Sequence, residues 1–203
     1  MEEARRRGFL GPGPVDVHLD HAAGFAEALT ASFSPGLASA PAQGADLGSG
    51  GGVPGLPLAL HFPHCRWTLV DSAVRRATFL REAVRDLELD GRVEVVELRA
   101  ELLGRSADHR GRYDLVVARG FGPPAVVAEC AAPLLEPAGR AVVSEPPGGV
   151  PTRWPADGLA MLGMVPDTPG VARGWAYQVL CQDRPCPDRY PRRVGVPAKR
   201  PLF

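Results

Sequence analysis

The hydrophobic positions at the start of the chain recur with a helical period, and after residue 44 they change to alternating strand-like and helix-like runs. Residues 15–33 predict an amphipathic helix whose apolar face carries Val15, Leu19, Ala22, Phe25, Ala26 and Leu29. Residues 1–14 are charged and then rich in Gly and Pro, which predicts an arm, and the small residues of 34–44 predict a linker. We therefore expect an N-terminal arm and helix over residues 1–40.

The part of the chain after the linker alternates between strand and helix patterns. Strands are predicted from Ala45 into the glycine-rich loop and at 67–71, 92–99, 113–120, 139–145 and 175–181, with helices at 56–61, 72–89 and 125–136. The apolar stripe of the helix at 72–89 consists of Val74, Ala77, Leu80, Val84 and Leu87. This order predicts an α/β fold with a doubly wound, mostly parallel sheet that is covered on both faces.

Polar and glycine-rich segments follow the predicted strands, at the edge where ligands of parallel sheets bind. These segments are the loop at 46–55, Asp71, residues 98–101 and Arg119. We expect them to converge on one crevice, because the carboxyl ends of parallel strands meet at one edge of the sheet.

The composition is typical of a globular protein and argues against several other classes. With 203 residues, 45% apolar residues and a formal net charge of zero, the chain suits one main domain over residues 41–184 with short appendages. No apolar run approaches the roughly 20 residues of a membrane span, and the N-terminus has no secretory signal. No CxxC pair occurs, so we expect free thiols in the cytoplasm at Cys65, Cys130, Cys181 and Cys186.

Two glycine patterns overlap in the loop that follows the first predicted strand. Gly50, Gly52 and Gly55 fit the GxGxxG of a dinucleotide-binding turn, whereas Asp46 and the glycines at 48, 50 and 52 fit the DxGxGxG of S-adenosylmethionine (SAM) sites. Asp71, at the next strand end, could bind ribose hydroxyls in either case. A carboxylate at the mouth of the loop would repel a diphosphate but suits a ligand with a sulfonium and an ammonium group. The loop therefore predicts SAM.

Five segments resemble the RsmG/GidB family in order and spacing: DLGSGGGVPGLPLAL, LVDSAVRRATFLREA, RAE, YDLVVARGF and YPRRVGVPAKRPL. The resemblance begins near residue 8 and reaches the C-terminus. It implies a class I SAM-dependent methyltransferase with a Rossmann-like, seven-stranded sheet, which methylates guanine N7 of 16S ribosomal RNA. The implied partners are SAM and 16S ribosomal RNA or the small ribosomal subunit, and we expect a cytoplasmic monomer.

The resemblance also implies roles for single residues. Gly48 and Val53 would line the methionine end of SAM, Asp71 would bind the ribose, and Arg119 would close the pocket. The other implied cofactor-binding residues are Asp46, Ser49 and Gly50 in the loop, Ser72 and Ala73 beside the adenosine, and Ala100 and Glu101 beside the adenine.

The last predicted segment, residues 185–203, is a basic and proline-rich tail. Tyr190 would be available to stack on a base, and phosphates would contact the charges. The RNA-binding residues that we predict here are Arg189, Arg192, Arg193, Lys199 and Arg200.

The implied reaction requires no catalytic base, because guanine N7 carries a free lone pair at neutral pH. We therefore predict no catalytic Ser, Cys or His and no metal site. His61, His64 and Cys65 lack further ligands at suitable spacing, and His18 and His21 share a helix face without an evident partner, so we interpret these residues as incidental.

Two departures from the family pattern keep alternatives open. Glu145, Pro146 and Pro147 stand where family members usually carry Lys-Gly, and Val17-His18 replaces an Arg-His pair. The first change places an anion near the expected path of the RNA. The alternatives are a SAM-dependent methyltransferase of another RNA or small molecule, and a SAM-binding paralogue without turnover.

Overall fold

The sheet is the central element of the protein, of which the computed structural model describes residues 1–32, 41–148, 151–167 and 169–203. Its strands follow the order β3-β2-β1-β4-β5-β8-β6, and an eighth short strand, β7, pairs with β8. The strands are β1 (Gln43–Leu47), β2 (Arg66–Val70), β3 (Val93–Val96), β4 (Tyr113–Ala118), β5 (Leu135–Glu145), β6 (Met164–Pro166), β7 (Gly170–Ala172) and β8 (Trp175–Gln182).

The first five strands are parallel, and β8 joins them antiparallel to β5. Leu47, at the end of β1, is in register with Val70 of β2 and with Ala118 of β4. The loops that follow these three strands therefore leave the sheet at the same edge. The strand order reverses between β1 and β4, which is where ligands of doubly wound sheets bind.

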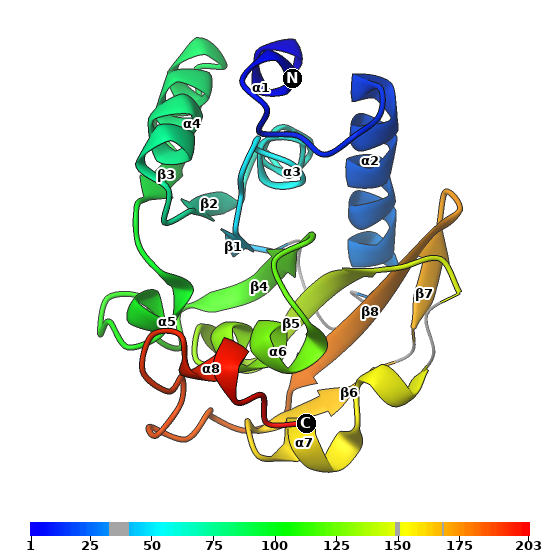
Figure 1. Ribbon diagram of the computed structural model, residues 1–203, viewed down its shortest axis with the longest axis vertical. Helices are drawn as coiled ribbons and strands as arrows, with labels where there is room; N and C mark the ends of the chain where they lie inside the picture. The colour runs from blue at the N-terminus through cyan, green and yellow to red at the C-terminus, as the bar shows by residue number, and fades with distance from the viewer. Residues whose placement is uncertain (33–40, 149–150, 168) are drawn as a thin grey trace.

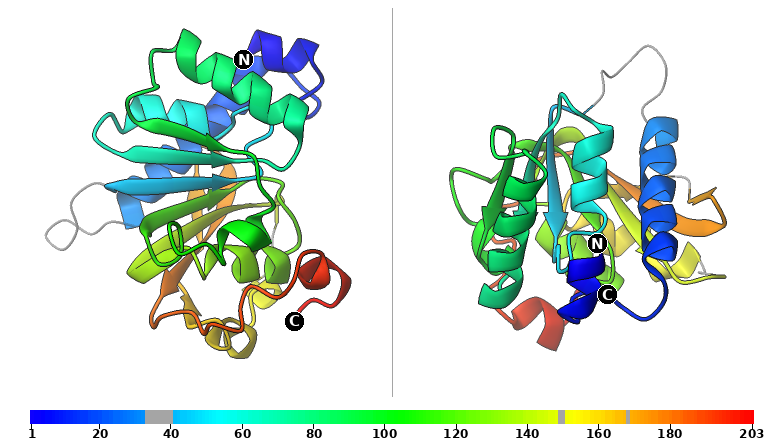
Figure 2. Two further views of the ribbon diagram at one scale, coloured as in Figure 1. Left: turned by 90° about the vertical axis from the view of Figure 1, so that its left-hand side faces the viewer. Right: turned by 90° about the horizontal axis from the view of Figure 1, so that it is seen from above.

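Helices cover both faces of the sheet (Figures 1 and 2). One face packs against α1 (Glu2–Arg6), α2 (Val15–Ser32), α3 (Gly55–His61) and α4 (Val74–Asp86). The other face is covered by α5 (Ala100–Leu103), α6 (Pro124–Ala131), α7 (Ala156–Ala160) and the C-terminal segment with α8 (Val196–Lys199), and a short 3-10 helix, Pro151–Arg153, precedes α7. Two hydrophobic cores result, one on each face, as expected for this class of fold.

The predicted fold class is confirmed, with local differences. The helix predicted at 125–136 ends at Ala131, and β5 already begins at Leu135. Pro133 explains the early end, because proline has no amide hydrogen for the helical ladder. The helices α1 and α5 and the strands β6 and β7 were not predicted, because segments of three to five residues are too short to show a periodicity. Residues 33–40, which include most of the predicted linker, lie outside the described residues.

Three of the residues predicted to face the core are exposed. Leu19, Val74 and Leu87 are 39%, 63% and 41% exposed. Leu87 lies beyond the end of α4 at Asp86, so the helical period no longer applies to it. Phe79, which was not part of the predicted stripe, is buried and packs against Phe9 with ring centroids 5.6 Å apart.

The segment predicted as an arm is attached to the domain. Ala4 of α1 is fully buried, and Arg7 forms an ion pair with Glu82 of α4 at 2.8 Å. Leu10 reaches the glycine loop, where its Cδ2 lies 2.7 Å from the position that a Cβ on Gly51 would take. The N-terminal residues therefore cover the cofactor loop predicted from the sequence.

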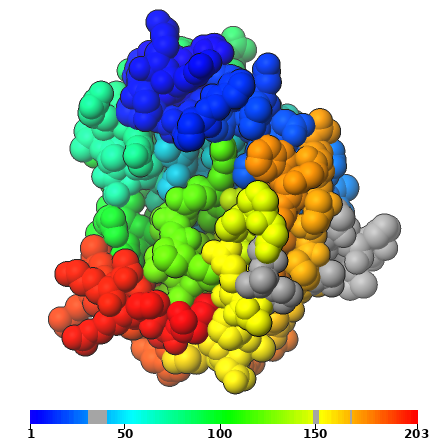
Figure 3. Space-filling model, turned by 45° about the vertical axis from the view of Figure 1, so that its right-hand side comes forward, coloured from blue at the N-terminus to red at the C-terminus, as the bar shows by residue number. Residues whose placement is uncertain are grey.

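The C-terminal tail is also part of the folded domain. In Figure 3 it lies at the lower end of the face shown, away from the N-terminal segment at the top. The side chain of Glu129 in α6 is fully buried and accepts hydrogen bonds from the guanidinium and the backbone N–H of Arg192, at 2.6 to 2.8 Å. Arg110 donates to the carbonyls of Cys186 and Tyr190. Tyr190 is buried in the core, so the prediction that it is free to stack on a base is wrong.

Replacing Arg192 should destabilise the protein, because it leaves the buried carboxylate of Glu129 without its counter-charge. We expect Arg192→Ala to lower the free energy of unfolding by about 3 kcal/mol, measured by urea denaturation. Arg193→Ala is the matched control, since Arg193 is the exposed neighbour and should change stability by less than about 0.5 kcal/mol. Equal effects of the two substitutions would show that the ion pair does not hold the tail.

Candidate functional site

The glycine loop after β1 turns through backbone conformations that favour glycine. Gly48, Gly50 and Gly52 have φ angles of +69°, +54° and +85°. A side chain at these positions would be strained, whereas glycine adopts them freely. At Gly48 a Cβ would also lie 2.8 Å from the ring of Phe121, so the glycine lets the loop after β4 approach the loop after β1.

Hydrogen bonds fix this loop to the neighbouring strand β2. The hydroxyl of Ser49 donates to the carbonyl of Asp46 at 2.9 Å and accepts from the N–H of Val70 at 3.1 Å. The carboxylate of Asp71 accepts from the N–H of Gly50 at 3.0 Å and from that of Ala73 at 2.9 Å. Arg76 lies 3.6 Å from the Asp71 carboxylate. The side chains of Ser49 and Asp71 therefore determine the shape of the loop.

Asp46 lies beneath the loop, and the prediction that it stands at the mouth is wrong. Its side chain is 1% exposed, and Oδ2 accepts a hydrogen bond from the N–H of Gly55 at 3.0 Å. Among the described residues no group donates to Oδ1. Burial raises the pKa of this carboxyl from 3.8 to about 7, opposed by hydrogen bonds and by the charge of Arg119.

Arg119, at the end of β4, is held by the N-terminal part of the chain. Its guanidinium donates to Nδ1 of His18 at 2.5 Å, and Nε2 of His18 lies 3.1 Å from the carbonyl of Gly11. These partners fix the imidazole as the tautomer with hydrogen on Nε2. Burial lowers the pKa of Arg119, and the carboxyl of Asp46 opposes that shift.

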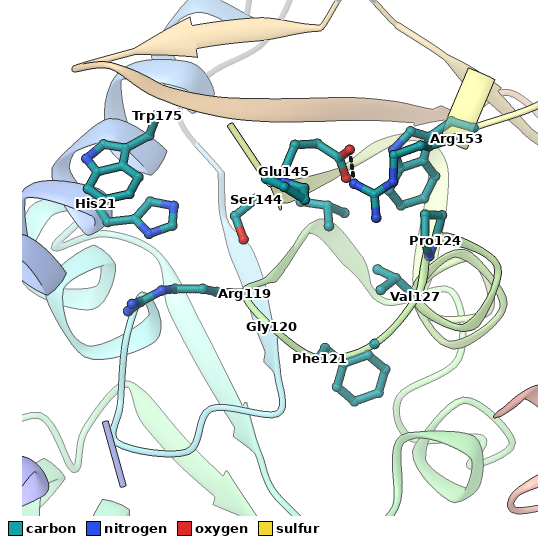
Figure 4. Close-up of a pocket in the computed structure, with 14 residues that line it drawn as sticks. His21, Arg119, Gly120, Phe121, Pro124, Val127, Ser144, Glu145, Arg153 and Trp175 are labelled. Carbon is teal, nitrogen blue, oxygen red and sulfur yellow. Dashed lines mark hydrogen bonds and ion pairs between the residues drawn. The ribbon is translucent and has the colours of Figure 1, made fainter. Parts of the chain in front are cut away.

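A pocket of about 420 Å³ adjoins this crevice at the ends of β4 and β5 (Figure 4). Phe121 lines the pocket and also lies against Gly48, so the pocket borders the glycine loop. Its other walls include the ion pair between Glu145 and Arg153 and the stacked rings of His21 and Trp175, whose centroids are 4.4 Å apart.

The structure brings most of the predicted cofactor residues to one edge. The loop, Asp71 with Ser72 and Ala73, and Arg119 all follow strand ends that are in register. Val53 is buried within the loop, and Ala100 is buried at the start of α5. Glu101 differs, because its Oε1 accepts hydrogen bonds from the N–H of Gly195 at 2.9 Å and from Arg99 at 3.2 Å, which ties this carboxylate to the tail.

Several residues of the site were not recognisable from the sequence. His18 and His21 were interpreted as incidental, but the structure makes one the partner of Arg119 and the other part of a pocket wall. Arg153 and Trp175 lie later in the chain than the segments predicted to form the crevice, and no local sequence pattern identifies them as site residues. Among the described residues, no group of three or more His, Cys, Asp or Glu side chains could hold a metal ion.

Comparison with known proteins identifies the family to which the chain belongs. The sequence matches the GidB family, described as rRNA small subunit methyltransferase G, over residues 28–144. A protein of Rubrobacter xylanophilus named ribosomal RNA small subunit methyltransferase G is 40% identical, covering 98% of this chain and 78% of the relative. The chain belongs to the rRNA small subunit methyltransferase G family. The resemblance inferred from the motifs is therefore confirmed, as is the assignment to methyltransferase enzymes.

Other relatives of the same family and several solved structures agree with this membership. The Deinococcus radiodurans protein of that name is 38% identical, with 93% of this chain and 75% of the relative covered. The fold is similar to antibiotic-resistance methyltransferase Kmr, with a TM-score of 0.54, 17% identity and coverage of 69% of this chain and 86% of that one. In the described part of the chain, no helix has the length and apolar character needed to cross a membrane.

The close contact between α3 and Asp46 provides a test of how the loop is built. A Cβ at Gly55 would lie 2.4 Å from Leu69 Cδ2 and 2.6 Å from Asp46 Oδ2. We expect Gly55→Ala to lower the free energy of unfolding by about 2 kcal/mol, because the packed atoms around it must move. Gly91→Ala, where a Cβ meets nothing within 4 Å, should change the urea midpoint little. A fully stable Gly55→Ala variant would contradict the packing described here.

Proposed function

We propose that this protein transfers a methyl group from SAM to N7 of a guanine in 16S ribosomal RNA. The observation that carries the proposal is membership of the rRNA small subunit methyltransferase G family, with similarity to a relative across 98% of the chain. We further propose that it acts as a monomer in the cytoplasm, with 16S ribosomal RNA or the small ribosomal subunit as its partner.

The residues at the carboxyl edge of the sheet fit SAM, which supplies a methyl group on a sulfonium. The carboxylate of Asp46 is buried with one oxygen unpartnered among the described residues, and this suits a ligand that carries positive charge. Gly48, Gly50 and Val53 would surround the methionine end, and Asp71 with its neighbours Ser72 and Ala73 would hold the adenosine. Ala100, and the backbone rather than the carboxylate of Glu101, would border the adenine.

The proposed reaction depends on orientation, because guanine N7 needs no deprotonation before it accepts a methyl group. The protein must align N7 with the methyl carbon, and well-oriented reactants can gain several orders of magnitude in rate. Arg119 lines the pocket next to the loop, where its guanidinium, held by His18, would close the cofactor site. No side chain has to act as a general base in this scheme.

The exposed basic residues of the tail would contact the RNA backbone. Arg193, Lys199 and Arg200 are exposed, and Arg189 lies over the ring of Tyr190 at 5.0 Å. Arg192 pairs with Glu129, so we propose that it positions the tail and contributes less charge to the RNA. These contacts would make RNA binding weaken with added salt.

Nucleoside mass analysis of 16S ribosomal RNA tests the proposed function. A deletion strain should lack one N7-methylguanosine that the parent strain carries, and purified protein with SAM should restore it on the unmodified RNA or subunit. Unchanged 16S methylation, with a missing methyl group in another RNA, would favour a different RNA substrate. SAM binding without any methyl transfer would favour a paralogue without turnover.

The raised pKa of Asp46 predicts that SAM affinity depends on pH. A cationic ligand favours the ionised carboxylate, whose pKa is about 7 in the free protein, so protonation at lower pH should compete with binding. We expect SAM to bind about tenfold more weakly at pH 6 than at pH 8, measured by calorimetry. Asp46→Asn should bind SAM more weakly and with little dependence on pH in this range.

The stability of the ligand-free protein should depend on pH with the opposite sign. Burial penalises the ionised carboxylate, so the contribution of Asp46 to stability falls as the pH rises from 3.8 to about 7.

A SAM affinity that is constant from pH 6 to pH 8 in the unsubstituted protein would show that Asp46 does not face the bound cation.

A further inference from the structure

The pocket beside the glycine loop contains a carboxylate for which methyl transfer itself has no need. Glu145 is the last residue of β5, and its side chain is 9% exposed. Its Oε2 accepts a hydrogen bond from Arg153, which lies in the short helix after the next turn. Both residues line the pocket, together with the aromatic rings of Phe121, Trp154 and Trp175.

The ion pair makes this carboxylate suitable for a neutral ligand. An unpaired buried carboxylate would attract a cation or take up a proton, but the guanidinium of Arg153 compensates the charge of Glu145. Among the described residues, Arg153 is the donor found at this carboxylate, and it binds through one of the two oxygens. The remaining lone pairs can accept hydrogen bonds from a neutral group that enters the pocket.

Guanine carries such donors on the edge that lies opposite N7. Its N1–H and its N2 amino group are adjacent donors, and a carboxylate can accept from both. When N7 points toward the glycine loop, this donor edge points to the far side of the pocket. Figure 4 shows Arg119, Gly120 and Phe121 along one side of the pocket and Glu145 with Arg153 along the other.

We propose that Glu145 recognises the target guanine by accepting hydrogen bonds from its N1–H and its N2 amino group. This inference rests on the proposed function and adds the group that selects guanine over other bases. Arg153 holds the carboxylate in place, and the aromatic walls accept the flat faces of an unstacked base.

The same contact would strengthen during the reaction. The N7 lone pair forms the new N–C bond while the S–C electron pair stays on sulfur, so the positive charge moves from the sulfonium to the purine. A carboxylate at N1–H stabilises the charge that develops on the ring, and an interaction that is stronger in the transition state raises kcat. Glu145 would therefore affect the rate as well as the binding of RNA.

Two further polar atoms are consistent with a polar ligand in this pocket. Nε2 of His21 and Nε1 of Trp154 belong to residues that line it, and both atoms are buried without a hydrogen-bond partner among the described residues. Buried polar atoms without partners are rare in folded proteins. Two of the side chains that line this pocket therefore carry a polar atom that no described group satisfies.

The sharpest test compares guanine with inosine, which lacks the N2 amino group. Once the methylated nucleotide is mapped, 16S ribosomal RNA ligated with guanosine or inosine at that position is assayed with SAM. The unsubstituted enzyme should prefer guanosine by about tenfold or more in kcat/KM. Glu145→Gln should lower kcat on the guanosine substrate by about tenfold or more and bring the preference close to one, because the amide can no longer accept from both donors.

Three controls separate recognition from a structural role. Glu136→Gln, at the exposed start of β5, should leave kcat, KM and SAM affinity unchanged. Glu145→Gln should retain SAM binding, which excludes misfolding. The exchange Glu145→Arg with Arg153→Glu restores an ion pair, so a purely structural role predicts recovery of activity, whereas base recognition predicts that activity stays low.

Failure of base recognition by Glu145 can be distinguished from failure of the proposed function. If the unsubstituted enzyme methylates the RNA and Glu145→Gln retains both the rate and the preference for guanosine, recognition by Glu145 is wrong while the proposed function stands. Recovery of activity in the exchange variant would also overturn the inference. An unsubstituted enzyme that binds SAM but methylates neither 16S RNA nor the subunit would overturn the proposed function and this inference together.

Discussion

Two carboxylates at the ends of adjacent parallel strands hold the glycine loop, and the rest of the site depends on them. Asp46 accepts from the N–H of Gly55 at the start of α3, and Asp71 accepts from the N–H of Gly50 within the loop. The loop is therefore fixed at its middle and at its C-terminal end by side chains that are at least 95% buried, with Asp46 and Asp71 at 1% and 5% exposure. Buried charge-assisted hydrogen bonds of this kind are strong when they are fully formed, so the loop is held in shape before any ligand arrives.

The two ends of the chain complete the site from outside the parallel sheet. The N-terminal segment packs over the loop and supplies His18, the partner of Arg119, while the C-terminal segment is anchored by the pair between Glu129 and Arg192. Both attachments are electrostatic contacts at buried or half-buried positions, where the loss of one partner leaves the other uncompensated. Both ends of the chain are thereby held against the folded domain.

Charge is distributed around the crevice in a way that separates the two proposed ligands. Acidic groups lie beneath and beside the loop, where a cationic cofactor would be favoured, and exposed basic residues lie on the tail, where RNA phosphates would be favoured. The pocket that borders the loop is lined by the ion pair of Glu145 with Arg153, by Arg119 and by several aromatic rings. The paired carboxylate and the flat rings suit a neutral nucleobase.

Much of the fold, and the crevice that forms the candidate cofactor site, could be predicted from local patterns. Alternating apolar runs determined the parallel sheet, and the glycines after β1 with Asp71 after β2 determined where the crevice lies, because carboxyl ends of parallel strands must share an edge. The elements α5, β6 and β7 are too short for a periodicity to be detected in the sequence. The exposure of single helix positions such as Leu19 and Val74 was also not predicted, since a helical period does not say which neighbours a helix meets.

What only the tertiary structure decided is the set of pairings between distant segments. The partner of Arg119 lies 101 residues earlier in the chain, that of Glu129 lies 63 residues later, and Glu145 finds Arg153 across a turn. From the sequence, Glu145 was an uncompensated anion, Arg192 a free cation, and the His18 imidazole incidental. A sequence determines which charges are present, but whether a charge is buried, paired or available to a ligand depends on which segments the fold brings into contact.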